Sequence, residues 1–412
     1  MIKEIVDKAR ADPDYVVRTA LESLKRAEGQ KYNYFLALDR DLPKRAERAS
    51  LLRSGRRLLG VVVAVKDNID VAGLPTTNGA PYAREVPELT APIVTALEEE
   101  GALVLGKTNM HELALGATNV NPHFGPTLNP RDPSRITGGS SGGSAGAVAL
   151  GIAHIALGTD TGGSVRIPAS LCGVVGYKPP YGALSLEGVR PLAPSLDHLG
   201  FFTSTVKDLV YLMSVLRGLR AEPPPRFRFG ILKGIAEPDE YVEKAFWRAV
   251  AKLESAGGER WEVEVNARKF SYARAAILLA EAASVNWGYL RRHEPEMGRD
   301  VATLLKVGAS LPAVAYLRAL EIQREAKSYF NSLLKRYDVL VTPTTAIAAP
   351  PVEEANTIAI RPKLLAYTEL FNLAGLPAIS VPAPAPHLPV GVQLVSSDEE
   401  RLLSIASKYE EA

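Results

Sequence analysis

Two glycine-serine clusters hold the serines best placed for nucleophilic chemistry. They are residues 138–143 and 162–164, and strongly apolar segments lie around them. Glycine-serine runs are more often linkers or turns, but a solvated linker would not lie between apolar segments. A serine after consecutive glycines can bring its hydroxyl and nearby N–H groups onto one atom. Ser140 and Ser164 are therefore candidate catalytic residues.

A base is also needed, because a serine hydroxyl is a poor nucleophile until its proton is removed. The usual base is histidine, but the six histidines are scattered in capping, loop and core contexts, and none falls in an obvious triad pattern. Lys66 directly follows the apolar residues 60–65. A lysine at a strand end more commonly points to water, but burial would lower its pKa from about 10.4 towards neutrality. Lys66 is therefore the candidate base.

The elements around these residues predict how the chain brings them together. Residues 60–65 read as a fully buried strand, and a strand at 102–106 follows a helix at 91–101. Residues 144–152 predict a small-residue helix capped by Ser144, and residues 154–157 predict a strand that ends at the second cluster. Ligands bind at the carboxyl ends of strands in open α/β sheets, so we expect the site at that edge.

The rest of the chain extends the same α/β pattern. Asp12 and the proline after it mark the start of a helix, and residues 184–205 read as loop-rich. No composition break forces a second domain, so residues 1–412 are expected to form one. The remaining predicted helices are 13–29, 42–55, 110–116, 206–216, 238–255, 270–290, 311–337 and 398–411, and the remaining strands are 34–38, 226–232, 260–265, 339–341, 378–381 and 390–394.

Composition excludes several classes of protein. The chain has 412 residues, 46% of them hydrophobic and 23% charged, which is enough for a large core. Its net charge of +2 creates no overall basic field, so direct nucleic-acid binding is not expected. The single cysteine, Cys172, excludes an intrachain disulfide and a cysteine-based zinc site. No metal, cofactor or membrane segment is expected, and a reducing cytoplasm is the expected location.

Three long motifs resemble the amidase-signature hydrolases. They are GVVVAVKDNIDVAG at 60–73, GGSSGGSAGAVA at 138–149 and GTDTGGSVRIPASLCGVVGYKP at 158–179. Four shorter motifs also match, namely FGPTLNPRDPSR, SLDHLG, YDVLVTPT and NLAGLPAISVP. The resemblance covers residues 60–210 and 337–395 and implies a large central mixed β-sheet with helices on both faces. It leaves the helix-rich residues 211–336 to shape the substrate pocket.

The resemblance also implies a Ser-cisSer-Lys triad. Ser164 would be the nucleophile, Ser140 a bridging serine after a cis peptide bond, and Lys66 the base that acts through Ser140. The N–H groups of Thr161, Gly162, Gly163 and Ser164 would form the oxyanion hole. The implied reaction is hydrolysis of a carboxylic amide, through an acyl-enzyme, to an acid and ammonia or an amine.

Neighbouring residues are expected to have structural roles. Asp160 would orient the loop backbone, and Arg166 would be a buried cation paired with a carboxylate. Ser141 and Ser144 would be turn and cap residues. Cys172 would be a packing residue, which makes a cysteine nucleophile a distant alternative.

The substrate is less clear than the chemistry. One alternative is the glutaminase subunit, known as the A subunit, of a tRNA-dependent amidotransferase, which hydrolyses glutamine and delivers ammonia to a partner subunit. In such subunits an arginine in the helix before the YDV-type strand holds the glutamine carboxylate, and Arg324 lies in the corresponding region. An exposed helical arginine is at least as good an interpretation of Arg324.

Three differences between this sequence and those of the amidotransferase A subunits favour a free-standing amidase. Those subunits carry an acidic residue before a Leu-Pro-X-Gly turn, whereas residues 383–387 here contain none. Ile167 stands where they have glutamine, and this chain is shorter than most of them. We therefore expect an amidase for a small, uncharged or aromatic acyl amide, with partner subunits only under the alternative. A third possibility, a non-catalytic scaffold of the same fold, is disfavoured because all three triad residues are present.

Overall fold

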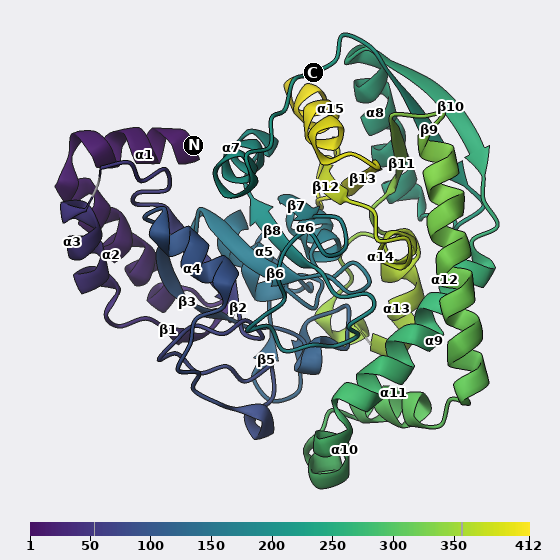
Figure 1. Cartoon of the computed structure of the whole chain (residues 1–412), viewed down its shortest axis with the longest axis horizontal. Helices are drawn as coiled ribbons and strands as arrows, with labels where there is room; N and C mark the ends of the chain where they lie inside the picture. Colours follow the sequence, from purple (N-terminus) through teal and green to yellow (C-terminus); the bar gives the residue numbers. More distant parts are fainter. Residues whose placement is uncertain (53, 356) are drawn as a thin grey trace.

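An 11-stranded mixed sheet runs through the whole molecule (Figure 1). The computed structural model describes residues 1–52, 54–355 and 357–412. The strands, in spatial order, are β1 (Phe35–Leu38), β3 (Leu103–Thr108), β2 (Val62–Lys66), β6 (Ile155–Thr159), β8 (Leu199–Thr203), β7 (Val175–Lys178), β12 (Ala378–Pro382), β13 (Gly391–Val395), β11 (Val339–Pro343), β9 (Phe227–Lys233) and β10 (Gly258–Glu264). The expected mixed sheet is confirmed.

Helices cover both faces of this sheet. Those of eight residues or more are α1 (Ile2–Ala11), α2 (Pro13–Gly29), α3 (Leu42–Leu51), α4 (Pro92–Glu99), α5 (Gly142–Ala149), α7 (Val206–Arg217), α8 (Glu240–Ser255), α9 (Arg268–Val285), α11 (Arg299–Ala309), α12 (Ala313–Leu334), α13 (Thr357–Leu365) and α15 (Glu399–Glu411). The shorter ones are α6 (Arg166–Cys172), α10 (Trp287–His293) and α14 (Glu369–Leu373). The expected helix at 42–55 ends at Leu51, and its position 53 lies outside the described residues.

Side-chain alternation along β2 assigns its residues to two cores. Val63 and Val65 join the apolar cluster that includes residues of α4, α7, α8 and α15. Ala64 instead joins the cluster built with α5. Because successive residues of a strand point to opposite faces, Lys66 lies on the same face as Ala64. The base expected from the sequence is thus on the α5 side of the sheet.

Parallel pairing places the ends of β2 and β6 at one edge. Val63 pairs with Ile155 and Val65 with Leu157 in a parallel register. The carboxyl ends of the two strands, Lys66 and Thr159, therefore meet at the same edge of the sheet. This is the arrangement that the two strand predictions implied.

Several expected elements differ from the observed ones. The loop-rich region expected at 184–205 contains β8, a central antiparallel strand between β6 and β7. The helix expected at 110–116 is only a short 3-10 turn, Glu112–Ala114. The helix expected at 270–290 is divided into α9 and α10, while the one expected at 311–337 is α12. The break between α9 and α10 lies at Asn286, and no proline or glycine between residues 270 and 287 marks it in the sequence.

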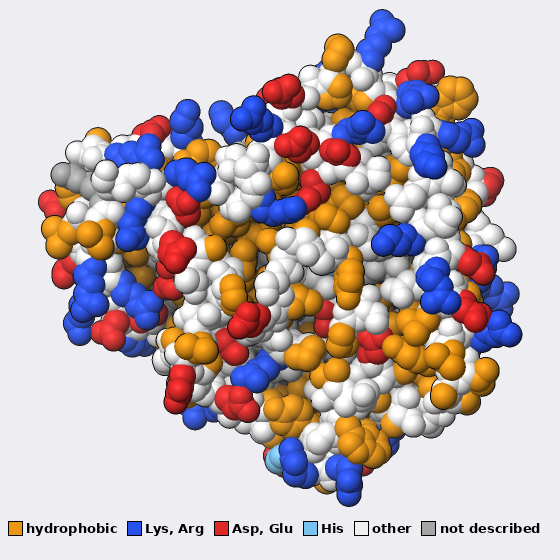
Figure 2. Space-filling model, viewed as in Figure 1, with side chains coloured by type: hydrophobic (Ala, Val, Ile, Leu, Met, Phe, Trp, Pro, Cys, Tyr) orange, Lys and Arg blue, Asp and Glu red, His pale blue; other side chains and the backbone are white. Residues whose placement is uncertain are grey.

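The surface carries charges of both signs. Figure 2 shows lysine and arginine side chains interspersed with aspartate and glutamate over the face in view. Within the described ranges, no single helix has the length and composition of a membrane span, although α11 and α12, a pair bent by 95°, pass that test together. The same residues contain no group of three or more His, Cys, Asp or Glu that could hold a metal ion.

Candidate active site

Lys66 is buried at the carboxyl end of β2 and has two hydroxyl partners. Its Nζ donates a hydrogen bond to Ser140 Oγ at 2.7 Å and lies 2.8 Å from Thr159 Oγ1. Asn68 Nδ2 also donates to Thr159 Oγ1, at 3.1 Å. The lysine side chain is 0% exposed, so it points into the protein rather than to water. The expected contact between Lys66 and Ser140 is therefore confirmed.

Burial changes the acid-base behaviour of this lysine. Desolvation lowers the pKa of the Lys66 amine from 10.5 to about 7, although the carboxylates of Asp160 and Asp197 act in the opposite direction. A buried ammonium loses the hydration that stabilises its charge. Near neutral pH the amine therefore exists substantially in its neutral form, which can accept a proton.

Ser140 lies in a tightly anchored segment. The Gly139–Ser140 peptide bond is cis, as the resemblance implied. The Gly139 N–H donates to the Ala117 carbonyl at 2.7 Å, and the Ser140 carbonyl accepts from the His111 N–H at 3.1 Å. A Cβ on Gly139 would lie 2.8 Å from the backbone nitrogen of Asn119, so only glycine fits there. These contacts fix the position of the Ser140 hydroxyl next to Lys66.

Ser164 lies on the loop between β6 and α6. Its carbonyl accepts a hydrogen bond from the Ser141 N–H at 3.3 Å, which brings the two glycine-serine clusters side by side. Ser164 is 8% exposed, whereas Ser140 and Lys66 are 0% exposed. Of the three, Ser164 is therefore the one that a substrate can reach.

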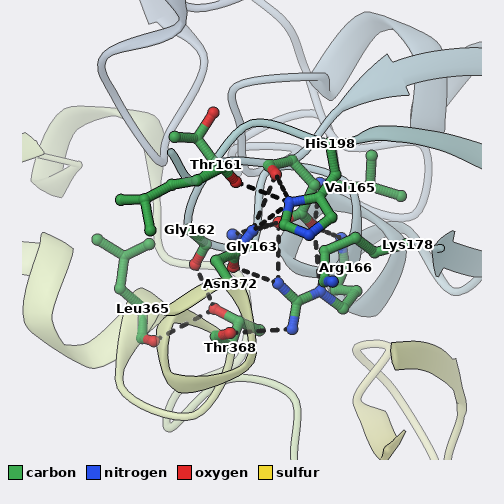
Figure 3. A network of polar contacts seen from close by, with 12 residues as sticks. Thr161, Gly162, Gly163, Val165, Arg166, Lys178, His198, Leu365, Thr368 and Asn372 are labelled. Carbon is green, nitrogen blue, oxygen red and sulfur yellow. Dashed lines mark hydrogen bonds and ion pairs between the residues drawn. The ribbon is translucent and has the colours of Figure 1, made fainter. Parts of the chain in front are cut away.

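Asp160 organises the nucleophile loop, of which Gly163, Val165 and Arg166 are labelled in Figure 3. Its carboxylate accepts hydrogen bonds from the N–H groups of Gly163 at 2.8 Å and Val165 at 3.1 Å. Arg166 donates to the same carboxylate through Nε at 3.0 Å and Nη2 at 2.8 Å. The structural roles expected for Asp160 and Arg166 are both confirmed.

Arg166 connects this loop to the C-terminal part of the chain. Its Nη1 donates to the Thr368 carbonyl at 3.0 Å and to Gln393 Oε1 at 2.6 Å, while Nη2 donates to Asn372 Oδ1 at 2.6 Å. Burial alone would raise the pKa of Asp160, but Arg166 and the other donors hold that pKa well below its usual range. Asp160 is therefore a carboxylate at neutral pH.

Removing the Arg166 charge should destabilise the fold strongly. Arg166→Met leaves the fully buried Asp160 carboxylate without its cation, and breaking such a pair costs about 3–5 kcal/mol. We expect the free energy of unfolding in urea to fall by that amount. Arg268→Gln, which removes an exposed arginine on α9, should change it by less than about 0.5 kcal/mol. Equal stabilities of the two variants would contradict the role given to the pair.

One of the four expected oxyanion donors is already engaged. The Gly163 N–H carries a single proton and donates it to Asp160, so the expectation for Gly163 is corrected. This glycine has φ +131, and a Cβ on it would lie 2.2 Å from Thr368 Oγ1, so it shapes the loop. The roles of Thr161, Gly162 and Ser164 as donors stay predictions.

The two serines expected as turn and cap residues anchor α5. Ser141 is the N-cap residue of this helix, and its hydroxyl donates to the Thr159 carbonyl at 3.2 Å. Ser144, expected as the cap, lies inside the first turn and donates to the Leu157 carbonyl at 2.8 Å. The expected cap position is therefore wrong, because the helix begins two residues earlier at Gly142.

The expected substrate contact, Arg324, is exposed on α12. A different arginine approaches the nucleophile loop. Arg274 on α9 is 5% exposed, and its Nη1 lies 3.9 Å from the point where a Cβ on Gly162 would be. Arg274 forms an ion pair with the buried Glu369 of α14. Neither residue was expected from the sequence, since neither belongs to a motif that signals chemistry.

The two residue differences that favoured a free-standing amidase have structural explanations. Ile167 is buried, and its side chain packs beside Gly138 and Gly163. The segment at 383–387 lies against α8, where Tyr241 accepts hydrogen bonds from the N–H groups of His387 and Leu388. Glu369 on α14 is a buried carboxylate elsewhere in this part of the chain, and its partner is Arg274.

Known proteins resemble this chain over nearly its whole length. The family model described as Amidase matches residues 16–403. The A subunit of glutamyl-tRNA(Gln) amidotransferase from Methanosarcina mazei is 36% identical over 99% of this chain and 95% of its own length. A solved structure described as an amidase has a TM-score of 0.90 at 35% identity, covering 99% of this chain and 98% of that one. The solved A subunit of glutamyl-tRNA(Gln) amidotransferase from Thermotoga maritima has a TM-score of 0.84 at 30% identity, covering 100% of this chain and 94% of that one.

Proposed function

Since the chain belongs to the amidase family and is an enzyme acting on amide C–N bonds, we propose that it cleaves its substrate through Ser164, Ser140 and Lys66. The observation that carries this proposal is the 2.7 Å hydrogen bond between the buried Lys66 amine and Ser140 Oγ. It gives a serine near the nucleophile direct contact with a base whose pKa of about 7 suits proton transfer at neutral pH.

The proposed reaction has two stages. In the first, neutral Lys66 takes the proton of Ser140, Ser140 takes that of Ser164, and Ser164 Oγ bonds to the amide carbonyl carbon. The N–H groups of Thr161, Gly162 and Ser164 stabilise the oxyanion, and single donors of this kind are typically worth about 10²–10³ in rate. The relayed proton then passes to the leaving nitrogen, the C–N bond breaks and ammonia departs.

The second stage uses the same proton path with water as the nucleophile. Water attacks the ester carbonyl of the acylated Ser164 and gives up a proton through Ser140 to Lys66. Collapse of the tetrahedral intermediate breaks the bond between Ser164 Oγ and the acyl carbon. Ser164 regains its proton and the carboxylic acid leaves, so that each group returns to its starting state.

We propose glutamine as the amide and a tRNA-dependent amidotransferase as the setting. The relatives named as A subunits of glutamyl-tRNA(Gln) amidotransferases support this alternative over the free-standing amidase that the residue differences favoured. Their similarity extends over nearly the whole chain, including the helix-rich region 211–336. In this setting a partner subunit receives the released ammonia. The second candidate is a free-standing amidase, which the solved amidase structure with a TM-score of 0.90 favours.

Ammonia release separates the two candidates. The full-length chain is incubated with glutamine and with uncharged amides of similar size, alone and with the remaining amidotransferase subunits encoded by the same genome. We expect glutamine to be the preferred substrate and its hydrolysis to increase when the partner subunits are added. Rapid hydrolysis of uncharged amides, with no response to glutamine or to the subunits, would identify the free-standing amidase. Ser164→Ala is the background control for both assays.

A further inference from the structure

Three lysines with fully buried side chains lie at or next to the carboxyl ends of strands, and the partners of their amines differ. They are Lys66 on β2, Lys107 on β3 and Lys178 on β7. Lys178 Nζ donates to two backbone carbonyls, at 2.6 and 3.2 Å. Lys107 Nζ donates to the backbone carbonyls of Asp67 and Pro75 and to a threonine hydroxyl. Because a carbonyl oxygen can only accept, most partners of these two amines suit a donor alone.

Lys66 has partners of a different kind. Among the residues that the structure describes, its amine forms hydrogen bonds with two hydroxyl groups, those of Ser140 and Thr159. A hydroxyl group can donate as well as accept, an ammonium offers three N–H groups, and a neutral amine offers two N–H groups and a lone pair. The partners of Lys66 can therefore satisfy both forms of the amine. A base that alternates between these forms requires such partners.

Thr159 is held firmly beside the amine. It is the last residue of β6, it is 4% exposed, and it pairs with Leu199 of β8. Its Oγ1 accepts a hydrogen bond from Asn68 Nδ2 at 3.1 Å, and its carbonyl accepts one from Ser141 Oγ at 3.2 Å. Its side chain is β-branched and has few rotamers. The strand and these two bonds thus fix the position of the Thr159 hydroxyl.

The bond to Thr159 limits the directions in which the lone pair of the neutral amine can point. Two of the three tetrahedral positions on Nζ carry protons and the third carries the lone pair. An N–H directed at Thr159 Oγ1 keeps the lone pair out of that position, so fewer orientations compete with the one that faces Ser140. Proton transfer is faster when the donor and the acceptor are already aligned.

We propose that Thr159 is a positioning residue for the base: its hydroxyl accepts one N–H of Lys66 in both protonation states and so directs the lone pair of the neutral amine at Ser140. This inference rests on the proposed function, because it adds a residue to the Ser164 relay. Ser140 changes from donor to acceptor when Lys66 takes its proton, whereas Thr159 accepts throughout. The Thr159 oxygen also stabilises the ammonium once it has formed.

Two carboxylates also act on the charge of Lys66. Asp160 and Asp197 raise its pKa, against the larger effect of burial. Each has hydrogen-bond donors of its own, the Gly163 N–H for Asp160 and the Thr161 hydroxyl for Asp197. Both carboxylates remain in every variant of Thr159. A change of titration among those variants therefore reports the Thr159 hydroxyl.

Replacing the hydroxyl with a methyl group tests the proposal. Thr159→Val keeps the shape of the side chain, Thr159→Ala also removes the hydroxyl, and Thr159→Ser retains it. The rate at which an uncharged fluorophosphonate labels Ser164 in the full-length proteins is measured from pH 5 to 9. We expect Thr159→Val and Thr159→Ala to react at least about tenfold more slowly at the alkaline plateau. Their inflection should lie about one pH unit below the native one, because the ammonium loses an acceptor. Thr159→Ser should keep the native inflection and most of the rate.

Thr203→Val is the matched control. Thr203 is a fully buried threonine of β8 that pairs with Ile155, at the other end of β6, and its hydroxyl donates to the Thr205 carbonyl at 2.8 Å. This variant should keep the native rate and inflection, and circular dichroism verifies that each variant is folded. An unchanged inflection in Thr159→Val and Thr159→Ala would overturn the proposal, even if the reaction were slower. So would a Thr159→Ser protein that behaves like Thr159→Val, or an equal shift in Thr203→Val.

A direct titration separates this proposal from that of the nucleophile. Lysine labelled with carbon-13 at Cε reports the pKa of the Lys66 amine by NMR without any reaction, and Lys66→Met identifies its signal. We expect a lower pKa in Thr159→Val than in the native protein and a native pKa in Thr159→Ser. Failure of the fluorophosphonate to label Ser164 in the native protein would count against the proposed function. Equal pKa values in the native and Thr159→Val proteins would reject the role of Thr159 alone.

Discussion

Replacing Ser164 with alanine should lower kcat/KM for amide hydrolysis by at least about 10⁴-fold, because the acyl-enzyme cannot form. The variant loses one oxygen atom at a residue that is 8% exposed, and the backbone bonds that fix the loop remain. Its free energy of unfolding should therefore be close to that of the native protein. Ammonia release under single-turnover conditions, together with urea denaturation, measures both quantities.

Cys172→Ala provides the matched control for the nucleophile. Cys172 is the single cysteine, it is fully buried, and burial raises the pKa of its thiol far above neutrality. Its thiol donates to the Thr137 carbonyl at 3.5 Å and so acts as a packing group. Cys172→Ala should retain activity and fluorophosphonate labelling. If activity instead survived Ser164→Ala and disappeared in Cys172→Ala, the assignment would be wrong.

Lys66→Met should reduce kcat/KM by about 10²–10⁴-fold, the range expected for loss of a positioned base. Methionine fills most of the buried space without a charge. In the native protein the base is active when neutral, so kcat/KM should rise as pH increases through about 7 and level off about one unit above it. The variant should lose this rising limb. A pH-rate profile from pH 5 to 9 on both proteins checks the prediction.

A second buried lysine gives a control of the same type. Lys107 lies on β3, the strand that pairs with β2, and burial lowers its pKa to about 8. Its Nζ donates to Thr76 Oγ1 at 2.7 Å and to the Pro75 carbonyl at 3.2 Å, and lies 3.8 Å from Asp67 Oδ1. Lys107→Met should keep the inflection near pH 7 even if the protein becomes less stable. Loss of the inflection in this variant, but not in Lys66→Met, would exclude Lys66 as the base.

The elements that carry the triad could be predicted because their signals are local. The apolar run before Lys66 forms β2, and the run before the second glycine-serine cluster forms β6. The mixed sheet followed from these alternating elements and from the resemblance. β8 was missed because Leu199 and the residues after it follow a loop-rich stretch and form a short strand only by pairing with β6 and β7. Tertiary pairing of that kind leaves little trace in local propensity.

The parts of the site that could not be predicted depend on distant partners. Arg274 and Glu369 are 95 positions apart, and each alone resembles an ordinary helical charge. Arg324 lies in the expected region, the helix before the YDV-type strand, but its side chain on α12 is exposed. The engagement of the Gly163 N–H by Asp160 depends on loop geometry that residue types do not encode. Packing therefore decides which arginine approaches the nucleophile loop and which N–H group of the loop is used inside the protein.

The contacts of Arg166 determine how much of the polypeptide an active fragment must contain. Lys66, Ser140 and Ser164 all lie in the first 164 positions, yet the loop bearing Ser164 is held through Arg166 by Thr368, Asn372 and Gln393. An open reading frame truncated before position 366 would encode every triad residue and still lack the partners that shape the nucleophile loop. A motif search would count such a fragment as an enzyme, whereas the physical unit of activity includes the far end of the polypeptide.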